Sequence, residues 1–344
     1  MPLGLADAGL LLLAFLVPFL LTLLGLPRYL KALVRLGRVS DDVHKNPPTK
    51  VPEPAGPMLF LAALLGELVV AFAFNSIVPL AVTLGAGIAF LVGLADDLYV
   101  LGGKTKPLLL LLAGVAFVGT VLLKSNLYEP VLSFPLLGDT NSHFIIYTVL
   151  AVVAFPVVTN AFNMMDSFNG EISWFTLLAS LALLVGVGLH AAFTTGFSLA
   201  RVASVLPLVA VAASFLIFNR YPAKAFDGDS GALMFGAMFA GLAITGGVEI
   251  AAMIAIVPAI LNSFYTLSSV RGFVERRRMA SRPTYLGEDG TLNASMERDA
   301  PNTLVRLVLL AGPLSEGDLV KSIVILTSGA CLLSAAISVL TWVY

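Results

Sequence analysis

The sequence predicts an all-α, polytopic membrane protein with about ten transmembrane helices. Of its 344 residues, 58% are hydrophobic and only 12% are charged, whereas soluble domains are about 45–50% apolar and about 25% charged. Apolar runs long enough to cross a bilayer follow one another along most of the chain. Basic residues collect in alternate loops between these runs. We therefore expect a single integral membrane domain over residues 1–344.

Ten segments reach the length of about 20 mostly apolar residues that a spanning helix needs. In chain order they are residues 6–26, 55–74, 76–95, 107–124, 144–163, 171–189, 198–218, 230–246, 247–268 and 319–342. The first segment is not typical of a signal peptide, because it lacks a basic leading region and contains Asp7. The one long polar excursion, residues 269–318, is predicted to be a cytoplasmic loop that contributes to the substrate site.

The basic residues predict the orientation of these spans. With ten spans, 17 of the 20 Lys and Arg residues fall in one set of alternate loops, and only Lys124 and Arg201 fall in the other. By the positive-inside rule the first set is cytoplasmic, and both termini are extracytoplasmic. A dropped or merged helix would destroy this bias, so the bias supports the ten-span interpretation.

Net charge and cysteine usage exclude several classes of protein. The formal net charge of −1 gives no overall basic field, so we expect no nucleic-acid partner. The single cysteine, Cys331, excludes an internal disulfide framework and a cysteine-ligated metal site.

Acidic and amide residues gather at the predicted cytoplasmic ends of the spans. They form four groups: Asp41, Asp42 and Glu53; Asp96 and Asp97; Asn160, Asn163, Asp166 and Asn169; and Asn219, Asp227 and Asp229. Carboxylates at a membrane face are costly unless they are paired, hydrated or metal-bound. The alternative is that these acids only form the polar ends of the spans and have no common function. Four groups on one side of the membrane favour a shared site instead.

The residue types in these groups suit a hard cation. Carboxylate and amide oxygens are preferred by Mg²⁺, with Mn²⁺ as an alternative. The three histidines, His44, His143 and His190, are scattered along the chain and argue against zinc. Adjacent residues of a helix project about 100° apart. One of Asp96 and Asp97 can therefore face a metal or phosphate while neighbours orient the other.

Lysines and arginines accompany these acids, as a diphosphate ligand requires. They are Lys45, Lys50, Lys104, Lys106, Lys224, Arg276, Arg277, Arg278 and Arg282. For the run Arg276–Arg278, a positive-inside anchor or a contact with anionic lipid is an equally good interpretation.

Together these motifs resemble those of the polyprenyl-phosphate N-acetylhexosamine-1-phosphate transferases. The matching stretches are DVHKNPPTKVPEPAG (42–56), GLADD followed by Lys106 (93–106), NAFNMMDSFNG (160–170), FNRYPAKAFDGDSG (218–231) and LNSFYTL (261–267). The resemblance implies transfer of a sugar 1-phosphate from a UDP-sugar to a polyprenyl or dolichyl phosphate, with Mg²⁺ and release of UMP. It also implies a cytoplasmic site, in a prokaryotic cell membrane in preference to the endoplasmic reticulum. A homodimer is left open.

The resemblance also assigns roles to residues. It implies catalytic residues Asp96, Asp97 and Lys106, and metal ligands Asn163 and Asp229. It implies that the substrate-binding residues are Asp42, Lys45, Glu53, Asn160, Asp166, Asn169, Asn219, Lys224, Asn262 and Arg282, with Asn169 placed where nucleoside contacts are expected.

Three alternatives remain at this point. The three-histidine signature of the bacterial MurNAc-pentapeptide branch is absent, which favours UDP-GlcNAc as donor, although Asp166 matches the bacterial form of its motif. Direct attack by the lipid phosphate is preferred, with one of Asp96 and Asp97 orienting or deprotonating it, but a route through an aspartyl-phosphate is open. A secondary transporter or lipid carrier would instead use Glu67 and Glu249 as coupling acids.

Overall fold

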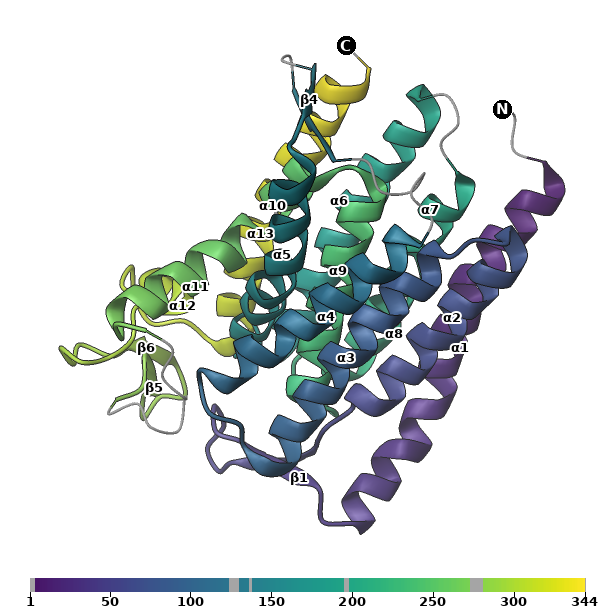
Figure 1. Cartoon of the computed structure of the whole chain (residues 1–344). Coiled ribbons are helices and arrows are strands. Elements are labelled where there is room, and N and C mark those ends of the chain that lie inside the picture. The colour runs from purple at the N-terminus through teal and green to yellow at the C-terminus, as the bar shows by residue number, and fades with distance from the viewer. Residues whose placement is uncertain (1–3, 124–129, 136–137, 195–197, 273–280, 344) are drawn as a thin grey trace.

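The computed structural model describes the chain except for residues 1–3, 124–129, 136–137, 195–197, 273–280 and 344. Its longer helices run side by side in one bundle, with both termini at the same end and the strands β1, β5 and β6 toward the opposite end (Figure 1). The helices are α1 (Leu5–Arg35), α2 (Gly56–Phe74), α3 (Val78–Tyr99), α4 (Thr105–Leu122), α5 (Phe144–Met164), α6 (Glu171–Phe193), α7 (Leu199–Ala203), α8 (Val205–Asn219), α9 (Gly228–Gly246), α10 (Glu249–Ala255), α11 (Val257–Ser269), α12 (Leu304–Leu309) and α13 (Glu316–Trp342).

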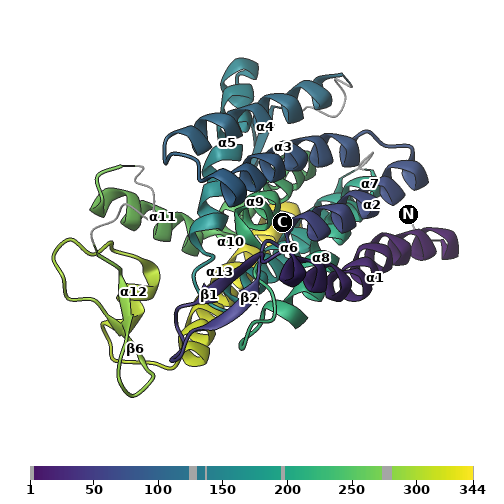
Figure 2. The same cartoon turned by 90° about the horizontal axis from the view of Figure 1, so that it is seen from below.

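Three short antiparallel hairpins interrupt the helices. They pair β1 (Val39–Asp42) with β2 (Thr49–Pro52), β3 (Val131–Phe134) with β4 (Gly138–Asn141), and β5 (Thr284–Leu286) with β6 (Leu292–Ala294). Seen from below, the β1–β2 hairpin lies across the end of the bundle, while β6 and α12 project to one side of it (Figure 2).

The central position in the bundle belongs to α9. Most of its residues are Gly, Ala, Ser and Thr interspersed with Leu, Met and Phe, and almost all of the helix is buried. It packs against α2, α3 and α5. Small side chains let helix backbones approach closely where no aqueous hydrophobic effect drives association. The outer helices instead expose large apolar side chains, as a lipid-facing surface requires.

Helices lie at approximately the positions of the predicted spans. In the described part of the chain, nine helical segments are long and apolar enough to cross a membrane, and α10 with α11 makes a tenth if that bent pair counts as one span. The protein is therefore a helical, multi-pass membrane protein. The break between α2 and α3 is three residues long, and it begins with a left-handed residue, Asn75, at φ 45°.

Two boundaries differ from the sequence prediction. α1 continues to Arg35, well past the predicted end at residue 26, because Leu30 and Leu33 extend the buried stripe that includes Leu26. The predicted span 247–268 is bent by 66° between α10 and α11. Pro258 lies in the first turn of α11 and has no N–H to donate to the preceding turn, so the helix cannot run straight through this point.

Candidate active site

Four polar side chains from four different helices meet where α3 ends and α9 begins. This Lys106 cluster consists of Asp96 of α3, Lys106 of α4, Asn163 of α5 and Asp229 of α9. Lys106 Nζ lies 2.7 Å from Asp96 Oδ2 and also forms an ion pair with Asp229. The Asn163 amide donates to Asp229 Oδ1 at 2.6 Å. The Asp96, Lys106 and Asp229 side chains are 14%, 15% and 27% exposed, so the cluster is shielded but open to solvent.

Asp97 points away from this cluster, as its adjacent position on the helix predicts. Its Oδ1 accepts the Asp229 backbone N–H at 2.8 Å, and its Oδ2 accepts the Ser230 N–H at 3.1 Å. The first N–H groups of a helix have no partner within the helix. Asp97 therefore fixes the start of α9, which carries Asp229, relative to α3, which carries Asp96.

Two glycines permit this close packing. A Cβ on Gly93 would lie 2.5 Å from the backbone oxygen of Asp229, so only glycine fits at this crossing of α3 and α9. Gly228 has φ +70°, and a Cβ there would approach both Pro54 and the Asp97 carboxylate. Asp229 can therefore lie beside α3 because Gly93 and Gly228 have no side chains that would obstruct the contact.

Asn163 and Asp229 have the donor set and proximity that a hard divalent cation requires. A rotation of the Asn163 amide exchanges its nitrogen for its oxygen, so both side chains can present oxygen to the space between them. Mg²⁺ binds oxygen at about 2.0–2.1 Å. Because the two side chains are already 2.6 Å apart, both fit a single ion.

A second group of polar side chains, the Asn169 cluster, consists of Asp42, Lys45, Asn169 and Glu316. Lys45 Nζ lies 2.5 Å from Asp42 Oδ2 and 3.1 Å from Glu316 Oε2. Asn169 donates its side-chain amide to Asp42 Oδ2 at 3.0 Å and its backbone N–H to Glu316 Oε1 at 2.9 Å. The cluster joins the β1–β2 hairpin, the loop between α5 and α6, and the start of α13.

Aromatic rings surround the Asn169 cluster. The His44 imidazole stacks on Phe168 with ring centroids 4.3 Å apart, and Lys45 Nζ lies 4.6 Å from the centroid of the Tyr221 ring. The loop that carries Tyr221 also supplies the Ala223 N–H, which donates to Asn169 Oδ1 at 2.7 Å. Hydrogen-bond donors, acceptors and flat rings therefore lie together at this place.

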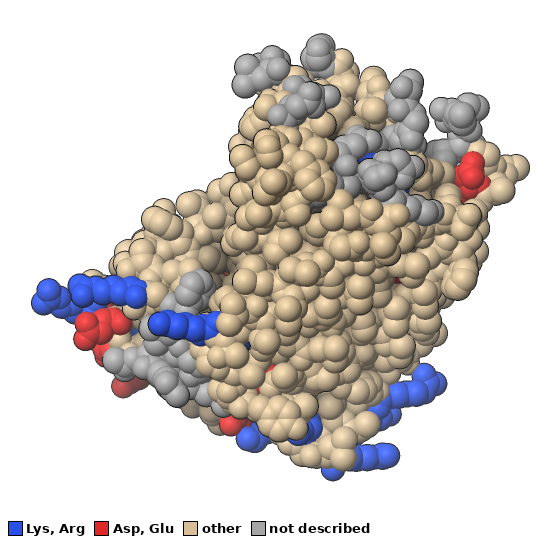
Figure 3. Space-filling view, viewed as in Figure 1, with Lys and Arg blue, Asp and Glu red and all other residues tan. Residues whose placement is uncertain are grey.

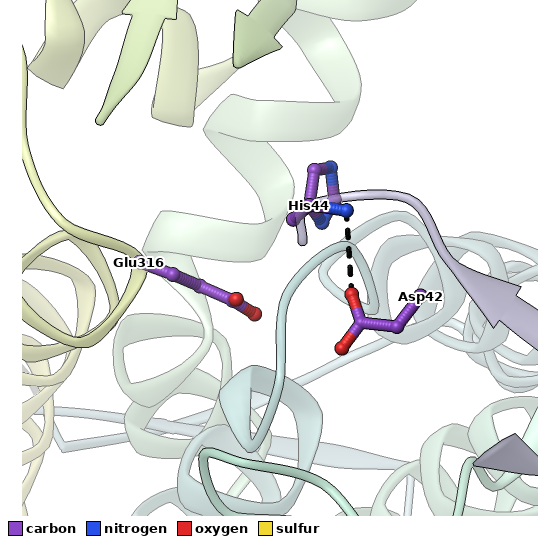
Figure 4. Close-up of side chains that lie close together, drawn as sticks. All are labelled: Asp42, His44 and Glu316. Carbon is purple, nitrogen blue, oxygen red and sulfur yellow. Dashed lines mark hydrogen bonds between the residues drawn. The ribbon is translucent and has the colours of Figure 1, made fainter. Parts of the chain in front are cut away.

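Three possible metal ligands lie close together at the Asn169 cluster, and Lys45 already pairs with two of them. The carboxylates of Asp42 and Glu316 approach each other with His44 beside them (Figure 4), and their ligand atoms lie within 4.8 Å of one another. Lys45 is bonded to both carboxylates. Lys106 likewise pairs with both Asp96 and Asp229, so a lysine partner does not by itself distinguish the two clusters as cation sites.

The charges of Asp42 and Lys45 stabilise each other. Burial alone would raise the pKa of Asp42, but hydrogen bonds from Lys45 and Asn169 and the lysine charge outweigh it and lower that pKa. Burial alone would lower the pKa of Lys45, but the Asp42 and Glu316 carboxylates raise it. Both groups therefore stay ionised throughout the neutral range.

Several residues that were predicted for the site from sequence form hydrogen bonds outside both clusters. The Asn160 amide donates to Pro156 O in its own helix. Asn219 accepts from Ser173 and donates to Ala225 O. Asn262 connects α11 to the end of α5 and the start of α12 through Met164 O and the Leu304 N–H.

The remaining predicted site residues lie in the segments that connect the helices. Glu53 accepts a hydrogen bond from Ser40, and Asp166 is half-buried in the loop after α5. Lys224 and Arg282 are exposed, the latter beside the β5–β6 hairpin. The arginine run 276–278 lies outside the described residues. Among the described residues, no hydrogen bond or ion pair joins the Lys224 or Arg282 side chain to either cluster.

Glu316 is the member of the clusters that sequence reasoning missed. The available signal was its position as an acid that begins the last predicted span on the same side as the other acids. Asp227, which the sequence grouped with Asn219 and Asp229, joins neither cluster. It is fully buried, and neither of its oxygens forms a hydrogen bond with the described residues. Burial first, and then the charges of Asp166, Glu53 and Asp97, raise the pKa of Asp227 well above its usual range.

The two acids assigned to a transporter lie apart from the clusters. Glu249 accepts a hydrogen bond from the Tyr147 hydroxyl. Glu67 is buried within α2 and forms no hydrogen bond with the described residues, although Ser204 lies near enough to interact with it. Neither acid adjoins a described group of polar residues comparable with the two clusters.

The bundle and its site define a multi-pass membrane protein with acid, amide and lysine side chains gathered at the ends of its helices. The family model of glycosyl transferase family 4 matches residues 79–247, which include the whole Lys106 cluster. A provisionally named glycosyltransferase of Methanocaldococcus jannaschii is 31% identical over 279 residues, 81% of each chain. The chain belongs to glycosyl transferase family 4, which confirms the resemblance found in its motifs.

Two further relatives carry more specific names. A protein of Sulfolobus acidocaldarius is 24% identical over 315 residues, 90% of each chain, and is provisionally named a UDP-N-acetylglucosamine–dolichyl-phosphate N-acetylglucosaminephosphotransferase. A Bacillus subtilis protein is 28% identical over 236 residues, 68% of this chain and 62% of its own length. It is provisionally named an undecaprenyl-phosphate N-acetylglucosaminyl 1-phosphate transferase.

Proposed function

We propose that this protein transfers N-acetylglucosamine 1-phosphate from UDP-GlcNAc, or a close N-acetylhexosamine relative, to a polyprenyl or dolichyl phosphate. The observation that carries the proposal is the convergence of Lys106, Asp96, Asn163 and Asp229 at the helix ends. The names of the archaeal and bacterial relatives supply the substrate class.

In the proposed reaction an oxygen of the lipid phosphate attacks the sugar-bearing phosphorus of the donor. A new P–O–P bond forms, the original P–O bond to the uridine monophosphate group breaks, and UMP leaves. Asn163 and Asp229 would hold Mg²⁺, or Mn²⁺ in its place. When bound, the ion neutralises the charge of the diphosphate. Lys106, held between two carboxylates, turns its ammonium group toward the phosphate oxygens once they arrive.

Of the paired acids, Asp96 is the one that contacts Lys106, through its Oδ2, while its Oδ1 accepts the Leu101 N–H. Both oxygens of Asp97 are occupied by backbone N–H groups. A phosphate monoester has a second pKa near 6 and is mostly dianionic at neutral pH, so its attack needs no obligatory general base. Asp96 then serves to orient the acceptor through Lys106, its partner at 2.7 Å.

The Asn169 cluster is the proposed binding place of the donor's nucleoside. Uracil presents an N–H donor between two carbonyl acceptors and has a flat face. The Asp42 carboxylate, the donors on Lys45 and Asn169, and the stacked rings nearby offer complementary groups. Asn163 lies near the end of α5, and Asn169 lies in the loop that follows. The residues proposed for the metal and for the nucleoside are therefore close together in the sequence.

We propose that the clusters face the cytoplasm. In the view of Figure 3, Lys and Arg side chains gather on the lower part of the molecule, away from the termini. The positive-inside rule assigns this lower part to the cytoplasmic side. A lipid phosphate would then reach the helix ends from the inner leaflet, and a soluble UDP-sugar would reach them from the cytoplasm.

The test is incubation of the purified full-length protein with Mg²⁺, a polyprenyl phosphate and a panel of UDP-sugars, with UMP as the measured product. Lipid-dependent release of UMP from UDP-GlcNAc is expected. Release only from the peptide-bearing MurNAc donor would overturn the choice of sugar, and no release from any donor would overturn the proposed reaction.

A further inference from the structure

Glu316 is a buried carboxylate whose partners all come from distant parts of the chain. It lies in the first turn of α13 and is 5% exposed. Its Oε1 accepts the backbone N–H of Asn169 at 2.9 Å and also the Asn169 side-chain amide, while its Oε2 accepts from Lys45 at 3.1 Å. Buried polar groups are almost always paired, and here one carboxylate serves three donors.

The neighbouring acid of the same helical turn behaves differently. Asp318 is exposed, accepts from the Ser315 hydroxyl at 2.6 Å and pairs with Lys321 at 2.8 Å. These contacts stay within the first turns of α13. Asp318 therefore supports the start of its own helix, whereas Glu316 links that helix to two loops.

Glu316 completes the hydrogen bonding of Asn169. The Asn169 side chain also donates to Asp42 Oδ2 at 3.0 Å and accepts the Ala223 N–H at 2.7 Å. Without the Glu316 carboxylate, the Asn169 backbone N–H would lose its bonded acceptor and Lys45 would keep only Asp42. Both residues would then be free to take several positions, and ligand binding would have to order them again.

We infer that Glu316 is a positioning residue for the donor nucleotide, which holds Lys45 and Asn169 in the arrangement that receives the uridine end of the UDP-sugar. The inference rests on the proposed function and assigns Glu316 no contact with the reacting phosphates. The Lys106 cluster has no hydrogen bond to Glu316 among the described residues, so the two ends of the site can be perturbed separately.

The experiment compares full-length wild type and Glu316→Gln in detergent micelles with Mg²⁺. Isothermal titration calorimetry measures UMP binding, and UMP release at varied UDP-GlcNAc concentration gives KM and kcat. Hydrogen bonds to charged groups contribute enough that we expect the Kd for UMP and the KM for UDP-GlcNAc to rise about 10-fold or more. The kcat changes much less, because Lys106 and its partners are untouched.

Matched variants separate positioning from a general structural effect. Asp318→Asn removes an acid from the same helical turn and leaves Kd, KM and kcat unchanged. Asn169→Ala combined with Glu316→Gln raises KM by less than the product of the two single effects, because Glu316 acts through Asn169. If Glu316→Gln fails to fold, Glu316→Asp, which keeps the charge on a shorter side chain, provides the same comparison.

The outcomes distinguish the inference from the function on which it rests. Unchanged Kd and KM in Glu316→Gln, a loss confined to kcat, or independent effects of the two substitutions each overturn the role of Glu316 while wild-type turnover stands. A wild-type protein that neither binds UMP nor releases it overturns the proposed function, and the inference with it.

Discussion

Asp229→Asn is the substitution that tests the Lys106 cluster most directly. The wild-type carboxylate accepts from Asn163 on one oxygen and from Lys106 on the other. An asparagine keeps the shape but must turn an NH₂ group toward one of these donors, and it removes the charge that offsets a divalent cation. Loss of a group that stabilises developing charge costs about 100-fold in kcat, or about 2.7 kcal/mol at 1.36 kcal/mol for each factor of ten.

The assay is UMP release at saturating UDP-GlcNAc and lipid phosphate, with the melting temperature measured in parallel. We expect kcat to fall by about 100-fold or more, with the fold retained because the side chain borders solvent. Asp227→Asn is the matched control. Since burial raises the pKa of that carboxyl and its oxygens form no hydrogen bond with the described residues, its amide should reduce turnover far less. Near-normal turnover in Asp229→Asn, with Asp227→Asn inactive, would show that the metal is held by the other carboxylate.

Three further predictions follow from packing, charge and orientation. Gly93→Ala should lower both the melting temperature and turnover, because its methyl group would meet the α9 backbone; unchanged values would refute the close crossing. Uridine affinity should depend on the charges of the Asp42–Lys45 pair. It should weaken as the pH falls through the lowered pKa of Asp42 or rises past the raised pKa of Lys45, and a titration near pH 7 that persists after His44→Asn would contradict their pairing. In a cysteine-free background, Thr140→Cys and Glu288→Cys should react with impermeant maleimide from opposite sides of sealed vesicles, and labelling from one side would exclude the ten-span topology.

Much of the bundle could be predicted because a lipid environment imposes simple rules on sequence. Spans appear as apolar runs of fixed length, and the divergence of Asp96 from Asp97 follows from helix geometry alone. The bend before Val257 could not be found by hydropathy, since both halves are apolar. The continuation of α1 past Pro27 depends on burial of Leu30 and Leu33 against other helices, which composition does not reveal.

The site was predicted as a group of residue types, but its division into two clusters was not. Asn160 and Asn163 share a helix face, yet one bonds to its own helix and the other to Asp229. Such choices depend on which backbone groups lack partners in the folded protein. The pairing of Lys45 with Glu316 joins segments at opposite ends of the sequence, and no local pattern encodes a contact of that range.

The attachment of Asp97 to the start of α9 has a consequence for how a diphosphate can be recognised. Helix N-termini commonly bind phosphate through their free N–H groups and their positive dipole end. Here the N–H groups of Asp229 and Ser230 already donate to a carboxylate from the same chain, so the helix carries its own anion. An incoming phosphate finds these two amides already paired, which leaves its recognition to Lys106 and a bound cation. Affinity for the donor should therefore respond steeply to the supply of divalent cation and to the charge at Lys106, and little to the backbone of α9.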